Sequence, residues 1–201
     1  MDVRAAKEHQ KAAEMTPMQY AIWKGQQLRP GVPLYNMAHT FRISGPLDPA
    51  TFERAFKTMV AGTDVLRTVA CAEDGAMPVL NVLDDAPIHH QYSQVLDSAE
   101  PETELRNVIE TQMAMEFVDG SPLYDSHLVR VGPAEFAWCL TLHHLIVDFL
   151  TVTLLFERMS TLVGGDNTVT VWPEFGAYAD WLEQQQASPR RKRAVSYWER
   201  N

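Results

Sequence analysis

Residues 136–163 read FAWCLTLHHLIVDFLTVTLLFERMSTLV, and this stretch decides the fold that the sequence predicts. Phe136 to Leu142 is apolar at nearly every position, which is typical of a strand covered on both faces. From Phe149 to Val163 the pattern changes to helical spacing, with apolar residues at Val152, Leu155, Phe156, Met159 and Leu162. We therefore predict a buried strand, a short turn and an amphipathic helix. The turn holds His143, His144 and Asp148.

The rest of the chain alternates helical and strand patterns around this unit. Thr16, Pro17 and Gln19 form a capping box that begins a helix, which should end before Pro30. Further helices are predicted at Asp48 to Gly62, Glu100 to Phe117 and Phe175 to Gln186, and strands at Leu34 to Ser44, Val65 to Cys71, Met77 to Leu83, Ile88 to Val95 and Leu123 to Val131. This order predicts an α/β fold, an α+β two-layer arrangement in which one mixed β-sheet is flanked by helices.

The composition indicates an ordinary globular protein. Hydrophobic residues make up 46% of the 201 residues, and the net charge of -9 argues against nucleic acid or an anionic membrane as the main partner. Met1 to Glu14 is polar, so we expect a leader, with one folded unit over residues 15–201. Cys71 and Cys139 are too few for a disulfide framework, which favours a cytoplasmic protein with no membrane span.

The two adjacent histidines are the strongest candidates for chemistry. Successive side chains of a strand point to opposite faces, so one of His143 and His144 should enter the core and the other should face outward. A neutral imidazole there could take a proton from an amine or a hydroxyl near neutral pH. Two alternatives stay open. A histidine in an apolar run is often a satisfied core residue, and His144 with Asp148 could bind a metal together with His127 or the His89-His90 pair.

The motif Leu142-His143-His144-Leu145-Ile146-Val147-Asp148 resembles the H-H-x-x-x-D-G signature of nonribosomal peptide synthetase condensation domains. These domains belong to the chloramphenicol acetyltransferase-like acyltransferases. Four other segments are similar to motifs of the family and occur in its order. They are Thr16 to Trp23, Asp64 to Thr68, Tyr178 to Trp181 and Tyr197-Trp198.

The resemblance implies a fold, a reaction and partners. The chain should form one chloramphenicol acetyltransferase-like lobe, the N-terminal lobe of a condensation domain, without its second lobe. Such a domain forms an amide between an acyl or peptidyl donor and an aminoacyl acceptor. Both substrates hang on phosphopantetheine arms of upstream and downstream carrier proteins, and no cofactor or metal is bound. The resemblance implies that His144 is catalytic and that His143 supports it. It also implies that Asp148 pairs with Arg67 in a structural ion pair.

Two positions depart from the family pattern. Phe149 stands where the signature has glycine, and Gly62-Thr63-Asp64 stands where the family has R-H-E before the L-R-T that contains Arg67. A phenylalanine after Asp148 could shape or fill the pocket beside His144, since a bulky group in a closely packed site displaces its neighbours. Alternatively, Phe149 could turn into the core as the first residue of its helix.

The expected activity needs both lobes, because transition-state groups must surround the reacting centre. We therefore expect the isolated lobe to be inactive and to expose an apolar face that promotes self-association. Two other functions remain open. One is a free-standing acyltransferase that esterifies a small alcohol. The other is a non-catalytic interaction or scaffolding domain with a degenerate site.

Overall fold

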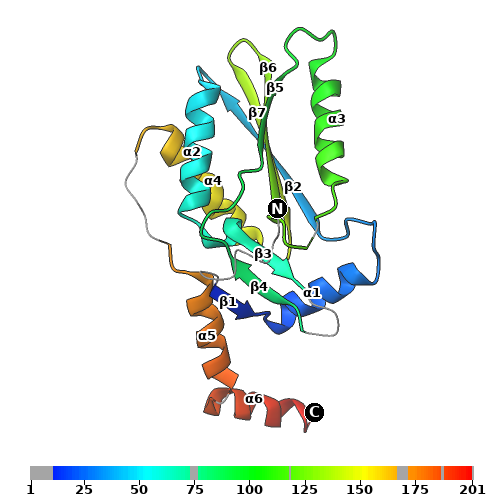
Figure 1. Ribbon diagram of the computed structural model, residues 1–201, viewed down its shortest axis with the longest axis vertical. Helices are drawn as coiled ribbons and strands as arrows, with labels where there is room; N and C mark the ends of the chain where they lie inside the picture. Colours follow the sequence, from blue (N-terminus) through cyan, green and yellow to red (C-terminus); the bar gives the residue numbers. More distant parts are fainter. Residues whose placement is uncertain (1–10, 73–76, 118, 167–171, 187, 201) are drawn as a thin grey trace.

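The computed structural model describes residues 11–72, 77–117, 119–166, 172–186 and 188–200, and its centre is a four-stranded sheet (Figure 1). The strand order is β2 (Asn36–Ser44), β7 (Glu135–His143), β6 (Tyr124–Gly132) and β5 (His90–Gln94). Neighbouring strands are antiparallel except β5 and β6, which are parallel. The mixed sheet that the sequence predicts is confirmed. The apolar strand β7 lies inside it, between β2 and β6.

Helices cover both faces of this sheet. Helices α2 (Pro49–Ala61) and α4 (Phe149–Val163) lie on one face, and α3 (Pro101–Met113) lies on the other (Figure 1). Beneath α2 and α4, the fully buried Trp138 ring packs edge-on against Phe52, with 5.5 Å between centroids. The α3 face has a smaller core of Leu105, Val129, Val131, Ala137 and Cys139. Helix α3 thus adds a third layer to the two-layer arrangement expected from the sequence.

A second, smaller sheet lies beside the first, in the order β1 (Lys11–Glu14), β4 (Val79–Val82) and β3 (Thr68–Cys71). Strands β3 and β4 form the predicted antiparallel pair, while the turn between them lies outside the described residues. The predicted strand from Val65 begins instead with a 3₁₀ turn, η2 (Asp64–Arg67). Strand β1 occupies the end of the expected leader, whose first ten residues also lie outside the described part.

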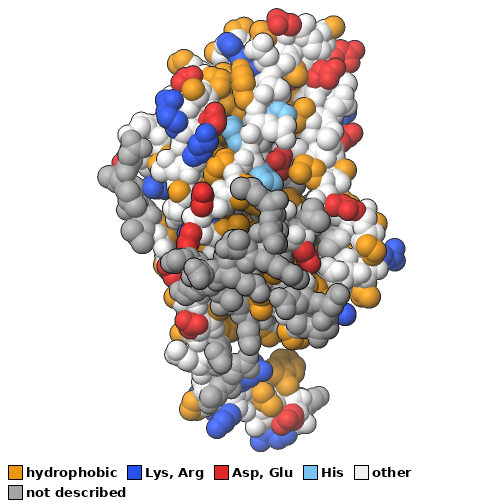
Figure 2. Space-filling model, in the orientation of Figure 1, with side chains coloured by type: hydrophobic (Ala, Val, Ile, Leu, Met, Phe, Trp, Pro, Cys, Tyr) orange, Lys and Arg blue, Asp and Glu red, His pale blue; other side chains and the backbone are white. Residues whose placement is uncertain are grey.

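Three helices complete the fold. Helix α1 (Pro17–Gln27) begins with the predicted capping box. Helices α5 (Phe175–Gln186) and α6 (Pro189–Trp198) extend away from the sheets, and Lys and Arg side chains gather at the α6 end (Figures 1 and 2). Within the described ranges, no helix is long and apolar enough to cross a membrane.

One helix end differs from its sequence prediction. Helix α3 ends at Met113, although the apolar pattern predicts a helix as far as Phe117. The side-chain amide of Asn36 donates to the carbonyl oxygens of Met113 and Met115, at 3.0 and 2.8 Å. These bonds satisfy carbonyl groups that the end of a helix leaves without partners. A residue of strand β2 therefore helps to end the helix.

A histidine also lies in the main core. The His90 ring packs between Phe52 and Phe56, with centroid distances of 5.7 and 5.2 Å. Its Nδ1 lies 2.9 Å from Ser126 Oγ, which accepts a hydrogen bond from the indole nitrogen of Trp138. Burial lowers the pKa of His90 to about 4, so the ring is neutral in the folded protein at neutral pH.

The lowered pKa of His90 predicts acid sensitivity. Between pH 6.5 and 4 the unfolded chain binds a proton at His90 that the folded chain does not, so stability falls as the pH falls through this window. Allowing for the part of the ring that solvent still screens, we expect His90 to account for about 1 kcal/mol of lost stability at pH 5 relative to pH 7.5. Urea denaturation of wild type and His90→Gln should show a smaller pH dependence in the variant. Equal slopes would contradict the assignment.

Candidate active site at the end of strand β7

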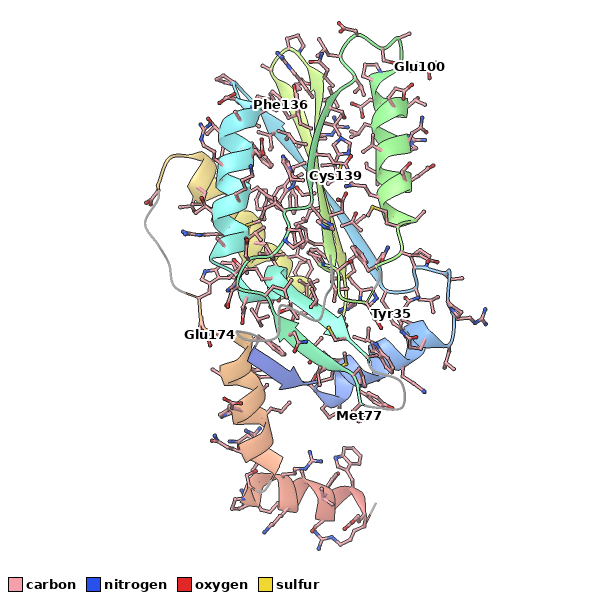
Figure 3. All side chains as sticks on the ribbon, in the orientation of Figure 1. Tyr35, Met77, Glu100, Phe136, Cys139 and Glu174 are labelled. Atoms are coloured by element: carbon pink, nitrogen blue, oxygen red, sulfur yellow. The ribbon has the colours of Figure 1, made fainter. Side chains whose placement is uncertain are left out.

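The turn that follows β7 is held to two other chain segments by its backbone. The His143 N–H donates to the Leu123 carbonyl at 2.9 Å, and the His144 N–H donates to the Tyr35 carbonyl at 2.8 Å. Figure 3 shows Phe136 and Tyr35 toward opposite ends of the sheet, with Cys139 between them. The turn therefore lies at the Tyr35 end, where the segments preceding β2 and β6 meet the end of β7.

His143 points into the protein and is 6% exposed. Its Nδ1 accepts a hydrogen bond from the Leu145 N–H at 3.1 Å, and its ring meets the rings of Tyr35 and Phe117 edge-on. Burial, and to a lesser extent the neighbouring His144, lowers the pKa of His143 to about 4. This side chain is a neutral part of the core that stabilises the turn.

His144 points outward, as the strand alternation predicts, and its side chain is exposed. Its Nδ1 lies 2.7 Å from the Val147 carbonyl oxygen, which can only accept a hydrogen bond. In the neutral ring, Nδ1 must therefore carry the proton, so Nε2 keeps its lone pair. The arrangement gives one exposed imidazole nitrogen that can accept a proton from a bound group.

Asp148 begins helix α4 as its N-cap. Its Oδ1 accepts hydrogen bonds from the backbone N–H and the hydroxyl of Thr151, at 2.8 and 2.7 Å. These bonds hold the pKa of the carboxyl below its usual value. The position thus fixes the direction in which the chain leaves the histidine turn.

The ion pair between Asp148 and Arg67 that the family resemblance implied is absent from the described residues. Arg67 donates through Nη1 to the Leu83 carbonyl at 2.5 Å, and its buried Nε has no hydrogen-bond partner. Asp148 is exposed, so its charge is solvated and it does not need a buried cation. Arg67 instead ties η2 to the residue that follows β4.

Phe149 is 82% exposed, and the next residue, Leu150, is 64% exposed. The alternative that Phe149 turns into the core as the first residue of α4 is therefore wrong. Leu154 and Phe156 are also partly exposed, at 41% and 37%. Helix α4 buries its Val152-Leu155-Met159-Leu162 stripe, and these four other apolar side chains lie outside that stripe. We call Phe149, Leu150, Leu154 and Phe156 the α4 surface.

Gln19 also contacts the turn, although no pattern in the sequence predicts this contact. The Gln19 Nε2 group donates to the Leu145 carbonyl at 3.1 Å, across a separation of 126 residues. Its Oε1 accepts from the backbone N–H of Thr16 at 3.0 Å, which closes the capping box. The capping pattern identified Gln19 as a helix residue, but it gave no signal of the long-range contact.

Two other histidines have side-chain partners of their own. His90 bonds Ser126, and His127 lies 2.8 Å from Ser93 Oγ. His127 pairs with Cys139, four positions before the end of β7, and about 13 Å of strand separates it from the turn. Among the described residues, no three His, Cys, Asp or Glu side chains gather to hold a metal. His144 and Asp148 are therefore not joined by His90 or His127.

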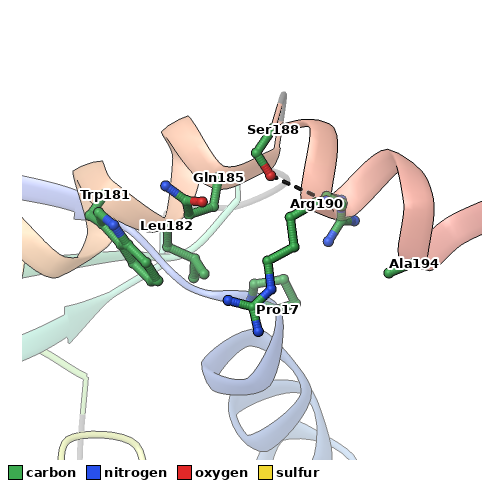
Figure 4. Close-up of a pocket in the computed structure, with 8 residues that line it drawn as sticks. Pro17, Trp181, Leu182, Gln185, Ser188, Arg190 and Ala194 are labelled. Carbon is green, nitrogen blue, oxygen red and sulfur yellow. Dashed lines mark hydrogen bonds between the residues drawn. The ribbon is translucent and has the colours of Figure 1, made fainter.

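A cavity of about 420 Å³ lies between the start of α1 and the helices α5 and α6 (Figure 4). Its lining residues are Pro17, Trp181, Leu182, Gln185, Ser188, Arg190, Arg191 and Ala194. Trp181 and Leu182 provide an apolar wall, and the Arg190 side chain extends toward Pro17. No residue of the histidine turn lines this cavity.

Comparison with known proteins identifies the family. Residues 9–201 match the condensation domain family. The chain belongs to this family. Among curated relatives, a dimodular nonribosomal peptide synthase of Bacillus subtilis is 30% identical over 150 residues, which are 73% of this chain and 6% of that protein. An isonitrile lipopeptide synthase of Streptomyces coeruleorubidus is 30% identical over 146 residues, which are 71% of this chain and 10% of that protein.

Solved structures show the same fold. The starter condensation domain of rhizomide synthetase superposes with a TM-score of 0.84 at 23% identity, over 94% of this chain and 49% of that chain. The first condensation domain of the calcium-dependent antibiotic synthetase, solved with a substrate analogue, gives 0.83 at 24% identity, over 94% and 46%. The chain therefore has the fold of the N-terminal half of a condensation domain. It spans just under half of each of these solved chains and a small part of the curated relatives.

The capping geometry of Asp148 predicts a modest, local effect on stability. Asp148→Ala should lower the free energy of unfolding by about 1 kcal/mol, whereas Asp148→Asn keeps a capping oxygen and should lower it much less. Because no ion pair joins Asp148 to Arg67, their alanine variants should be additive to within about 0.5 kcal/mol. A double-mutant cycle in urea denaturation measures the coupling energy between the two residues. A value well above about 0.5 kcal/mol would show that they do form an ion pair.

Proposed function

We propose that this chain forms the histidine-bearing half of a condensation site that joins two carrier-tethered substrates through an amide bond. The observation that carries the proposal is the geometry of His144. Its Nδ1 donates to the Val147 carbonyl, and its exposed Nε2 keeps a lone pair. Family membership of the chain supports the same assignment. His143 is buried with its Nδ1 occupied, so it is a supporting residue rather than a second base.

The reaction follows from this arrangement. The amine of an aminoacyl thioester attacks the carbonyl carbon of the donor thioester, and a C–N bond forms. Nε2 of His144 takes a proton from the attacking nitrogen, and the imidazolium stabilises the negatively charged tetrahedral intermediate. The C–S bond then breaks, and the proton neutralises the departing thiolate. Both substrates would arrive on phosphopantetheine arms of carrier proteins, and the chemistry needs no further cofactor.

A second half of the site must complete the reacting centre. This chain corresponds to just under half of the solved condensation domains, and His144 lies on its surface. The α4 surface, which begins five positions after His144, leaves large apolar side chains in contact with solvent, and this favours coverage by another surface. We infer that a C-terminal lobe supplies the opposite wall of the site. This N-terminal lobe would be inactive by itself. Uncovered, the α4 surface would promote self-association.

A non-catalytic role is the second candidate, and Phe149 is the observation that favours it. This large side chain is 82% exposed directly after Asp148 and five positions after His144. If the ring occupied the space that an acceptor needs, the domain could still bind carrier proteins without joining their substrates. A free-standing ester-forming acyltransferase would differ in its acceptor, which would be a free alcohol.

Replacing His144 tests the catalytic role. The intact protein that contains this lobe is incubated with a donor carrier and an acceptor carrier, both loaded, or with the donor carrier and a free alcohol. We expect His144→Ala to lower the rate of amide formation by roughly 10²–10⁴-fold, the usual contribution of a positioned acid-base group. Its melting temperature should stay near that of wild type because the side chain is exposed. Unchanged product formation would remove His144 from the mechanism.

Replacing Phe149 separates the two candidates. In a catalytic domain shaped by this ring, Phe149→Gly should alter the choice of acceptor or the KM while amide formation persists in both proteins. In a degenerate domain, product should appear only in the variant. Phe149→Leu is the matched control, because it keeps an apolar side chain and avoids the helix-destabilising effect of glycine. Product from wild type, followed by mass spectrometry of the acceptor carrier, would reject the non-catalytic role.

A further inference from the structure

The backbone groups of the histidine turn are nearly all occupied, and one side chain from another element contributes. Within the turn, the Ile146 N–H donates to the His143 carbonyl at 3.1 Å. The Leu145 N–H and the Val147 carbonyl are bonded to the two imidazole rings. Among the described residues, Gln19 is the one side chain from outside the turn that hydrogen-bonds to residues 143–147. The turn is thus anchored to α1 at Leu145.

The orientation of the Gln19 amide is determined by its two partners. Thr16 offers an N–H and a hydroxyl, which Oε1 can accept at 3.0 Å each, so Nε2 is the atom directed to the Leu145 carbonyl. An amide is needed because the same side chain must accept at one end and donate at the other. The capping box alone would be satisfied equally well by glutamate.

The Leu145 carbonyl lies two residues before the carbonyl that fixes the His144 tautomer. A change in its direction rotates the peptide planes between Leu145 and Val147. It therefore changes the 2.7 Å contact that keeps the proton on Nδ1 of His144. If that contact is lost, the proton can move to Nε2, and the exposed nitrogen becomes a donor instead of a base.

We propose that Gln19 is a positioning residue for His144, because its bond to the Leu145 carbonyl holds the turn that keeps Nε2 unprotonated. The inference rests on the proposed function for its kinetic consequence, while its structural part concerns the tautomer of His144 alone. This role is separate from capping, because the cap of α1 uses only the Oε1 atom of Gln19 and does not need its Nε2 group.

Gln19→Glu separates the two roles of this side chain. Glutamate keeps the acceptor for Thr16, so α1 remains capped, but an ionised carboxylate faces the Leu145 carbonyl without a proton to donate. At pH 8 we expect kcat for amide formation to fall roughly tenfold with little change in KM, since a small misplacement of a catalytic group is costly. As the pH falls and the carboxyl gains a proton, the ratio of variant to wild-type kcat should rise.

The matched control is Gln26→Glu at the other end of α1. The Gln26 amide also donates to carbonyl oxygens, those of Val32 at 2.8 Å and Arg29 at 3.3 Å, and it does not touch the histidine turn. This variant loses the same kind of hydrogen bond on the same helix. It should destabilise the protein to a similar degree and leave kcat and its pH profile unchanged.

An independent measurement reads the tautomer directly. In protein labelled with ¹⁵N-histidine, the His144 resonances should indicate a proton on Nδ1 in wild type and in Gln26→Glu, and a mixture of tautomers in Gln19→Glu. A wild-type tautomer and a wild-type kcat in Gln19→Glu would overturn the proposal. If the tautomer shifts but no wild-type condensation activity exists, the positioning role stands and the proposed function fails.

Discussion

The burial of β7 on both faces is the constraint on which the rest of the structure depends. A strand that passes between two helix layers must pair its backbone along its whole length, and β2 and β6 do this on either side. At the last residues of the strand this pairing continues into the turn, where the Leu123 and Tyr35 carbonyls accept from consecutive histidines. The first residues of the histidine turn are therefore held by the same kind of backbone hydrogen bonds as the strand they follow. The proposed role of His144 would gain from this, because little motion would have to be restricted when a substrate binds.

Histidine has two different roles in this structure. His143 and His90 are surrounded by aromatic rings and apolar side chains, and burial keeps both neutral at physiological pH. His144 is exposed, and a backbone carbonyl directs its proton. Strand alternation alone separates the adjacent pair, one into the core and one outward. The chemistry proposed for the turn therefore depends on the side-chain direction that a β-strand imposes.

The sequence predicted best those features that repeat along a single element. The apolar run of β7 and the stripe of α2 (Phe52, Ala55, Phe56, Met59 and Val60) appear where the periodicity placed them. The stripe of α4 does so except at Phe156, which is 37% exposed. The opposite directions of His143 and His144 were also predictable, since they follow from alternation.

The features that the sequence could not show depend on distant partners. Strand β1 is a short edge strand without alternating polarity, and its existence depends on pairing with β4. The Asn36 side chain bonds a carbonyl at the end of α3, and the Gln19 side chain bonds the Leu145 carbonyl, 126 residues away. The Asp148–Arg67 pair was implied by family resemblance, but the exposure of Asp148 removes the physical need for it.

The pairing of β2 with β7 also orders events during folding. Thr40 lies opposite Cys139, so the inner strand of the sheet meets a neighbour that was synthesised about a hundred residues earlier. Contacts of such long sequence separation form late and slowly, because a large loop must close before they contribute. The segments that contain Gln19, Tyr35 and Asn36 must remain available, unpaired, until residues 123–147 have been made. Until then the β2 edge is open to any other strand, including that of a neighbouring chain. The backbone bonds of the histidine turn to Tyr35 and Leu123 therefore depend on the closure of this long loop.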